Sequence, residues 1–448
     1  MGPSRRRNER LRALLGEARW TQAALARTVN ALAAEIDVEL HYDRTAVAHW
    51  LSGTRPAPPV PDLIAEAFTR RLGRAVPPAA TGLAADPGGA WGDRLRGFRM
   101  PVGARLSELC SLESDPARRA GARLLPYREA ELVQSTRSAM TGPQTAGGAE
   151  EGPGVVRLAV QFFSASFDAH GGQGARSSLA AYLTDDIAPL LREPGDRTPG
   201  RGLLVEASRL TFLLARMHQD AAVHGLAQQH FTTALQLADA SGDTTARAVV
   251  LRGLSAQGLA LGHRKNALRA AEVAAASPGA SGGPARAFLL SQLAVAQAAC
   301  GWHRSARVSL TRAETALAAG AGDGTGPFAT YAPGSLEFQR SQVLRYTGDL
   351  PAARTALANS LARRPAADHR GMALSHAQLG EILVGLGHVE EACASWNSFL
   401  DYFAVLRSAT ADQAALRMRQ LLTPFRNVPA AHAVLRRIRT STPPDGRP

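Results

Sequence analysis

The chain has few of the features that mark secreted, disulfide-bonded or membrane proteins. It contains only three cysteines in 448 residues, and Cys110, Cys300 and Cys393 are too widely spaced for a disulfide framework or a metal-binding knuckle. No run approaches the ~20 apolar residues that cross a bilayer, and the first residues, MGPSRRRNER, lead into no apolar signal segment. These absences predict a soluble, cytoplasmic protein that does not associate with membranes.

Aromatic residues and lysine are also scarce. Aromatics make up 5% of the chain, while alanine and leucine dominate the apolar residues, a composition that favours closely packed helices over β-sheet cores. Lys265 is the only lysine, so arginine carries almost all of the positive charge behind the net value of +13. Such a charge attracts polyanions without selecting one. Because residues 1–82 hold 12 arginines against 8 acidic residues, an argument for nucleic-acid binding needs a motif as well as charge.

No motif typical of a catalytic or cofactor site stands out. The glycine-rich run at residues 170–174 lacks the strand and the lysine of a phosphate-binding loop, and no nucleophile-elbow sequence occurs. His218, His224 and His230 are spaced by six residues, which places them on different faces of a helix. We therefore expect no enzymatic activity, no catalytic residue, no metal and no cofactor.

Two segments rich in proline and glycine, residues 75–92 and 141–154, divide the chain. They predict an N-terminal helix-turn-helix domain at 1–82, a linker with partial helix at 83–154, and a helical repeat domain at 155–440.

The first domain reads as a bundle of four short helices. Helical periodicity covers residues 8–19, 22–35, 44–51 and 62–72. Thr21 and Asp43 stand where side chains cap the second and third helices, and Ser52-Gly53 ends the third.

Glycines at regular intervals organise the repeat domain. Gly262, Gly301, Gly348 and Gly387 each separate two helical patterns, at spacings of 39, 47 and 39 residues. The clearest copy, from Leu379-Gly380 to Phe399, resembles the tetratricopeptide repeat (TPR), with a turn glycine and with alanine and aromatic residues in the second helix. The predicted fold class is therefore all-α, a helix-turn-helix bundle followed by a TPR-like α-solenoid.

The N-terminal domain resembles the lambda-repressor-like (XRE) helix-turn-helix family. The residues that carry the resemblance are the Thr21-Gln22 element with Leu25-Ala26, and the segment from Arg44 to Gly53 (RTAVAHWLSG). The resemblance implies binding to double-stranded DNA. It implies that Gln22 contacts a phosphate and that Val47 and Trp50 lie in the core. The residues expected to face the DNA groove are Arg44, Thr45, Ala48 and His49, and Arg55 is expected to contact the DNA backbone after the turn.

A basic arm precedes the first helix. Arg5, Arg6 and Arg7 are placed to lie along DNA phosphates, and the alternative is an ordinary solvated tail.

The whole arrangement is similar to actinomycete regulators of differentiation and antibiotic production of the NsdA type. It predicts a transcriptional regulator whose TPR-like groove senses a peptide or protein through Phe338, Gln342, Arg345 and Glu381, and a homodimer that reads two half-sites. The alternative is a protein-interaction scaffold with a degenerate helix-turn-helix that does not bind DNA. The interval from Gln22 to Trp50, which is longer than usual in the family, favours that alternative.

Overall fold

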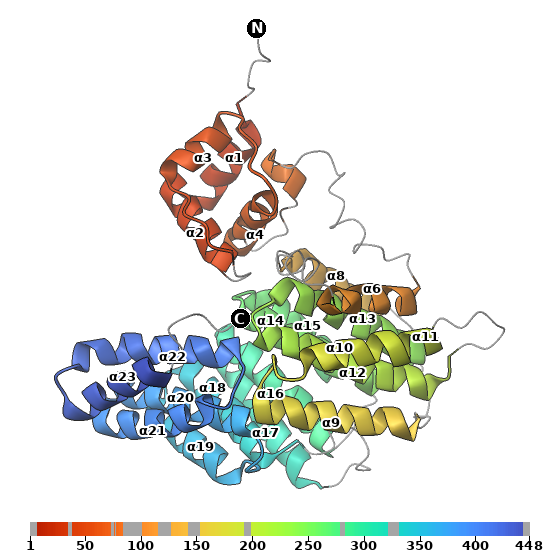
Figure 1. Cartoon of the computed structure of the whole chain (residues 1–448), viewed down its shortest axis with the longest axis vertical. Coiled ribbons are helices and arrows are strands. Elements are labelled where there is room, and N and C mark those ends of the chain that lie inside the picture. Colours follow the sequence, from red (N-terminus) through yellow and green to blue (C-terminus); the bar gives the residue numbers. More distant parts are fainter. Residues whose placement is uncertain are drawn as a thin grey trace.

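The computed structural model describes residues 7–34, 38–72, 76, 78–83, 101–114, 127–141, 153–191, 199–277, 283–320 and 331–441. All regular elements in these ranges are helices, which confirms the all-α prediction. A small N-terminal helical bundle, here called the head, is followed by packed helical hairpins, here called the repeat body (Figure 1). Within the described ranges, no helix combines the length and the apolar character that a membrane span needs.

The head contains the four helices that the sequence predicts. Their ends are set by side-chain caps, because Thr21 Oγ1 accepts a hydrogen bond from Ala24 N at 3.1 Å and Asp43 Oδ1 accepts one from Ala46 N at 2.9 Å. Gly53 follows the third helix with φ of 102°, a conformation that favours glycine. The helices are α1 (Glu9–Ala18), α2 (Gln22–Ala34), α3 (Arg44–Leu51) and α4 (Val60–Leu72).

The core of the head draws on all four helices and on the segment after them. Leu11, Leu25, Val47 and Phe68 are fully buried together. The short helix η1 (Pro78–Thr81) packs on α1 and α4, and Leu83 lies in the same core at 1% exposure. The head is thus a bundle that reaches at least residue 83.

The interval predicted as a linker with partial helix contributes two helices, α6 (Val102–Ser114) and α8 (Glu129–Thr141). Both pack against the repeat body: Leu106 and Cys110 of α6 are buried against later helices, and so is Leu132 of α8. These helices therefore belong structurally to the repeat body.

The repeat body is built from antiparallel helix pairs, each of which contacts its neighbours in turn. It begins with α9 (Gly154–His170), α10 (Arg176–Tyr182), the π-helix η2 (Leu183–Ile187) and α11 (Ala188–Leu190). The pairs that follow are α12 (Arg201–Asp220) with α13 (His224–Ser241), α14 (Thr244–Ala260) with α15 (Arg264–Ala275), α16 (Gly283–Ala299) with α17 (His303–Ala318), α18 (Pro333–Thr347) with α19 (Leu350–Arg363), α20 (His369–Gly385) with α21 (Val389–Phe403), and α22 (Ala409–Leu422) with α23 (Pro429–Ser441) after the short η3 (Thr423–Phe425).

The predicted turn glycines lie where the sequence places them. Gly262, Gly301, Gly348 and Gly387 follow α14, α16, α18 and α20 with φ between 82° and 89°. A glycine inside α20 has a different role. A Cβ atom on Gly380 would lie 2.4 Å from the indole of Trp396, so only glycine lets α21 approach this closely.

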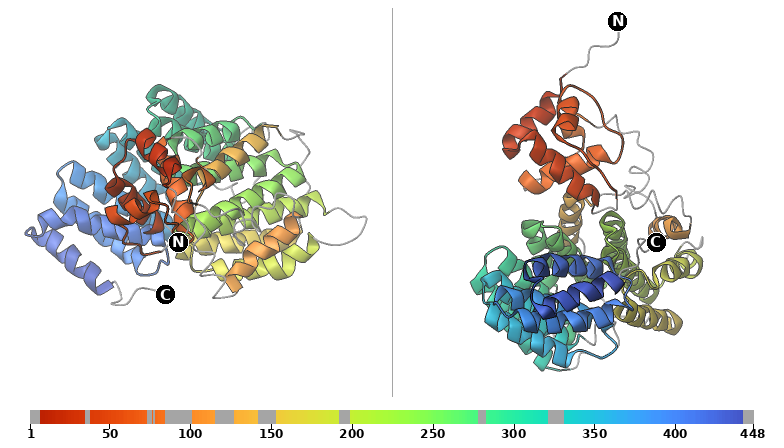
Figure 2. Two further views of the ribbon diagram at one scale, coloured as in Figure 1. Left: turned by 90° about the horizontal axis from the view of Figure 1, so that it is seen from above. Right: turned by 60° about the vertical axis from the view of Figure 1, so that its left-hand side comes forward.

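Early and late helices of the repeat body contact each other. Arg407 N donates a hydrogen bond to His170 O at 2.8 Å, and Arg370 Nη2 lies 2.7 Å from Asp220 Oδ1. Contacts between α20 and α9 continue this junction. The helices from α9 to α20 therefore curve back on themselves, and Figure 2 shows the head standing on one side of the repeat body.

Candidate nucleic-acid interface

Helix α3 is held to the head by one face. Val47 is fully buried and Trp50 is 3% exposed, and both pack into the core formed by α1, α2 and α4. The Trp50 ring also meets Tyr42 edge-on, with centroids 5.0 Å apart. These contacts confirm the core positions that the sequence indicated for α3.

The connection from α2 to α3 is fixed by one side chain. Asn30 of α2 donates from Nδ2 to Tyr42 O at 2.9 Å and accepts from Tyr42 N at 3.0 Å. These two hydrogen bonds, here called the Asn30–Tyr42 clamp, hold the chain one residue before Asp43, the N-cap of α3. Helix α3 consequently packs against α2 and α1 although the connection is longer than usual in the XRE family.

The opposite face of α3 is exposed. Arg44, Thr45, Ala48 and His49 all lie on this surface, and no ion pair joins Arg44 to another described residue. An α-helix with its side chains is about 10–12 Å across, which matches the ~12 Å width of a DNA major groove. Figure 1 shows α3 on the part of the head farther from the repeat body and α4 on the nearer part.

The N-terminus of α3 carries a negative charge of its own. The hydrogen bond from Ala46 N holds the pKa of Asp43 below its ordinary value, so this carboxylate is ionised. A carboxylate that already caps the helix opposes a phosphate at the same place. Any contact with a polyanion therefore falls to the side of α3, where Arg44 and His49 lie.

The other candidate residues lie around this helix. Gln22 is the first residue of α2 and is half-buried, while Arg55 is exposed in the segment after α3. Arg7 is exposed at the start of the described chain, and Asn8 N donates to Leu51 O at 2.9 Å, so the arm begins beside the C-terminal end of α3. Arg5 and Arg6 lie outside the described residues.

A polar interface that the sequence pattern did not predict joins the head to the repeat body. His263, at the start of α15, lies 3.1 Å from Glu66 Oε1 of α4 and 3.2 Å from Glu129 Oε2 of α8. Its side chain is 1% exposed, and Tyr127 stacks on its ring at 5.0 Å. Beside this group, Arg128 Nη2 and Asp62 Oδ1 are 2.6 Å apart.

These buried groups influence one another's protonation. Burial disfavours a charge on His263, but Glu129 and Glu66 outweigh it and raise the pKa of His263. Burial opposes ionisation of Glu129 as well, yet His263 and Asn266 lower the pKa of its carboxyl group. The one hint in the sequence is Glu66 itself, a carboxylate within the otherwise apolar stretch LIAEAF.

The four residues predicted for a peptide groove lie on α18 and α20, and the structure brings several of them together. Gln342 Nε2 donates to Gln378 Oε1 at 2.8 Å, and Arg345 Nη2 lies 3.2 Å from Glu381 Oε2. Glu381 also meets Arg417 of α22 at 3.0 Å. The guanidinium group of Arg364 lies over the ring of Phe338, and its Cζ atom is 5.5 Å from the ring centroid. These side chains form a ladder of mutual contacts along neighbouring helices, and peptide binding there stays a prediction.

Comparisons with known proteins concern the head. A family model described as the SP15 N-terminal domain matches residues 11–84, which are the helices of the head and the segment that completes its core. No curated protein matches the chain. The resemblances to XRE domains and to NsdA-type regulators stay predictions.

Proposed function

We propose that this protein is a DNA-binding transcriptional regulator in which α3 enters the major groove and the repeat body serves as a sensory or protein-interaction domain. The observation that carries the proposal is the two-sided character of α3. Val47 and Trp50 fasten it from below, and the exposed side presents Arg44, Thr45 and His49. Arginine pairs with guanine edges in two hydrogen bonds, and threonine contacts bases or a thymine methyl group.

The surroundings of α3 support the same reading. Arg55 and Arg7 flank the helix without an ion pair to any described acidic side chain, so both are available to phosphates.

We also propose that the protein is a homodimer. Helix-turn-helix domains of the XRE type, which the head resembles, bind DNA as two copies on half-sites ~34 Å apart. Light scattering of the full chain, with and without DNA, measures this directly, and a monomer under both conditions would contradict it.

The test is DNA binding by the full chain. A random pool of short duplexes is enriched for bound sequences, and affinity for the selected duplex is measured at several salt concentrations. The double variant Arg44→Ala with Thr45→Ala should weaken selective binding by about 10- to 100-fold, because one bidentate base contact contributes about 1–3 kcal/mol of discrimination. The matched control is Arg304→Ala, an exposed arginine of α17 in the repeat body, which should leave affinity unchanged.

The competing function is a protein-interaction scaffold that does not bind DNA. Its supporting observation is the capping carboxylate of Asp43, which places a negative charge at the start of α3. A scaffold predicts no enrichment of any duplex and no steep loss of binding with salt. Enrichment that disappears in the Arg44 and Thr45 variant excludes the scaffold, whereas equal binding by variant and wild type excludes α3 as the reading element.

A further inference from the structure

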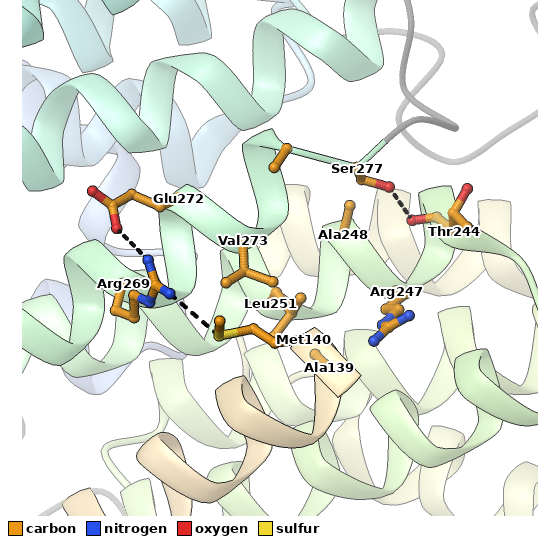
Figure 3. A pocket seen from close by; sticks show the side chains of 11 residues that line it. Ala139, Met140, Thr244, Arg247, Ala248, Leu251, Arg269, Glu272, Val273 and Ser277 are labelled. Atoms are coloured by element: carbon orange, nitrogen blue, oxygen red, sulfur yellow. Dashed lines mark hydrogen bonds and ion pairs between the residues drawn. The ribbon is translucent and has the colours of Figure 1, made fainter. Parts of the chain in front are cut away.

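A pocket of about 430 Å³ opens between α8, α14 and α15. Figure 3 shows Arg247 and Arg269 at its two sides, with Met140, Leu251 and Val273 between them. The remaining lining residues are Ala139, Thr244, Ala248, Glu272, Ala276 and Ser277. The volume falls within the range of pockets that hold small molecules, roughly 300–1,000 Å³.

Arg247 is the polar group that marks this pocket. Its side chain is 9% exposed, and its Nε lies 3.2 Å from Asp239 Oδ1. Its Nη2 is buried and has no hydrogen-bond partner among the described residues. A guanidinium group with an unpaired nitrogen is unfavourable in a buried position, so an acceptor on a ligand that reaches the Arg247 guanidinium would stabilise it.

The other charges of the pocket are already engaged. Arg269 Nη1 lies 3.3 Å from Glu272 Oε2, and its Nη2 donates to the sulfur of Met140 at 3.5 Å. Ser277 Oγ donates to Thr244 O at 2.9 Å. The guanidinium of Arg247 is therefore the group with hydrogen-bonding capacity left for a ligand.

The wall between the two arginines is apolar. Leu251 is 1% exposed, but Met140, at the C-terminal end of α8, is 44% exposed. A methionine side chain adapts its shape to what it contacts, which suits the mouth of a pocket. The combination of a buried cation and an adaptable apolar wall selects for a ligand with one anionic end and one apolar end.

We propose that this pocket binds a small carboxylic acid with an apolar body. The carboxylate accepts hydrogen bonds from Arg247, and the apolar part lies on Met140, Leu251 and Val273. Binding is non-covalent: the ligand displaces water from the pocket, and no chemical bond is made or broken.

The position of the pocket connects it with the head. Helix α8 contributes Ala139 and Met140 to the pocket at its C-terminal end, and Glu129 at its N-terminal end meets His263 and thereby Glu66 of α4. These ends are about 18–20 Å apart along one helix. A ligand that shifts α8 therefore acts on the helix that supports the head. This consequence rests on the proposed function, whereas binding to the pocket does not.

The test uses the full chain and octanoate as the probe, with octan-1-ol as the uncharged analogue, in calorimetric titrations. Octanoate should bind at one site and at least about tenfold more tightly than the alcohol, since only the carboxylate forms a charge-assisted hydrogen bond with Arg247. Arg247→Gln should remove this preference and leave binding of the alcohol unchanged. Arg304→Gln is the matched control, and its affinity for octanoate should equal that of the wild type because Arg304 is an exposed arginine of α17 that does not line the pocket.

A second variant tests the pocket independently, in case the Arg247→Gln protein does not fold. Val273→Trp fills the pocket and should abolish binding of octanoate and of octan-1-ol alike, while helical circular dichroism stays that of the wild type. Absence of saturable octanoate binding to the wild type overturns the proposal, and so does equal affinity in the Arg247→Gln protein.

Selective DNA binding is then measured with and without octanoate. DNA binding without any octanoate binding refutes the pocket and leaves the regulator intact. Octanoate binding by a chain that selects no duplex supports the pocket and refutes the proposed regulator.

Discussion

The two polar faces of the head differ in what their charges contact. On the α4 side, Glu66 and Asp62 are paired with His263 and Arg128, and the Glu66 side chain is 5% exposed. On the α3 side, Arg44 and His49 are exposed and no ion pair joins Arg44 to the rest of the described chain. Both helices have an apolar face in the same core.

This difference distinguishes an internal contact from an external one. Burying charges is unfavourable unless they are paired, so the α4 side is committed to the repeat body. Charges that stay hydrated on a rigid helix retain their hydrogen-bonding capacity for a partner molecule. Substitutions that remove one feature of each face at a time test this difference.

The largest effect is expected from the anchor of α3. Trp50→Ala should lower the stability of the head by about 3–5 kcal/mol, since it removes a 3% exposed indole and its contact with Tyr42. Native-state hydrogen exchange of the α3 and α4 amides reports this loss. His49→Ala, a neighbour on the exposed face, is the control and should change stability by less than about 0.5 kcal/mol. Equal effects of the two changes would mean that α3 is not held by its buried face.

The next effect is expected at the buried charges. Glu66→Gln should weaken docking of the head on the repeat body by about 2–3 kcal/mol, because the buried His263 of the repeat body loses a carboxylate partner. Exchange rates of α4 and of the first turn of α15 measure docking. Glu39→Gln, whose side chain is 86% exposed, serves as the matched control. If the two substitutions had the same small effect, the ionic contact would not hold the head.

Docking of the head should also depend on pH, with a smaller amplitude. Burial lowers the pKa of His263, and Glu129 and Glu66 together raise it further than burial lowers it. His263 therefore holds its proton more tightly when the head is docked and Glu66 lies beside it, so the stabilisation is complete below the ordinary histidine pKa of about 6.5 and is lost as the pH rises through the raised pKa.

Several titratable and polar groups surround His263 and influence how docking depends on pH. Glu66 and Arg70 face it from α4, Glu129 and Tyr127 from the segment of α8, and Asn266 lies close on its own helix. His263 and Asn266 lower the pKa of Glu129 against the effect of burial, and all three residues belong to the repeat body. This contribution therefore stabilises the contact of α8 with α15; it is present above the ordinary pKa of about 4.3 and disappears as the pH falls through the lowered value. His263→Gln should abolish the transition in docking, and a transition that survives the substitution belongs to another group.

The smallest effect is expected in the ladder of the repeat body. Arg345→Met should change stability by about 0–1 kcal/mol, because its ion pair with Glu381 is one-third exposed and Glu381 keeps Arg417. Urea unfolding followed by circular dichroism measures this change. Arg354→Met, which breaks an exposed pair with Glu391, provides the reference. A loss of several kcal/mol from the Arg345 substitution alone would show that the ladder supports the body much as a buried network does.

Local chemistry made much of the fold predictable. Caps at Thr21 and Asp43 and glycines at Gly262 and Gly387 act within a few residues, so helix ends follow from nearby sequence. The buried face of α3 was predictable for the same reason, since Val47 and Trp50 lie three residues apart on one side of a helix. The clamp between Asn30 and Tyr42 was not, because amide side chains make such bonds only after the tertiary structure brings them together.

Periodicity and short-range hydrogen bonds were enough to predict an all-helical chain, the ends of its main helices and the exposed polar edge of α3. Packing of the helices was needed to show that α6 and α8 belong to the repeat body, that His263 contacts Glu66 and Glu129, and that Arg247 borders a pocket with Met140. Each of these arrangements joins residues that lie far apart in the sequence. No local pattern encodes such pairs, since their energy comes from burial that exists only after the helices have packed.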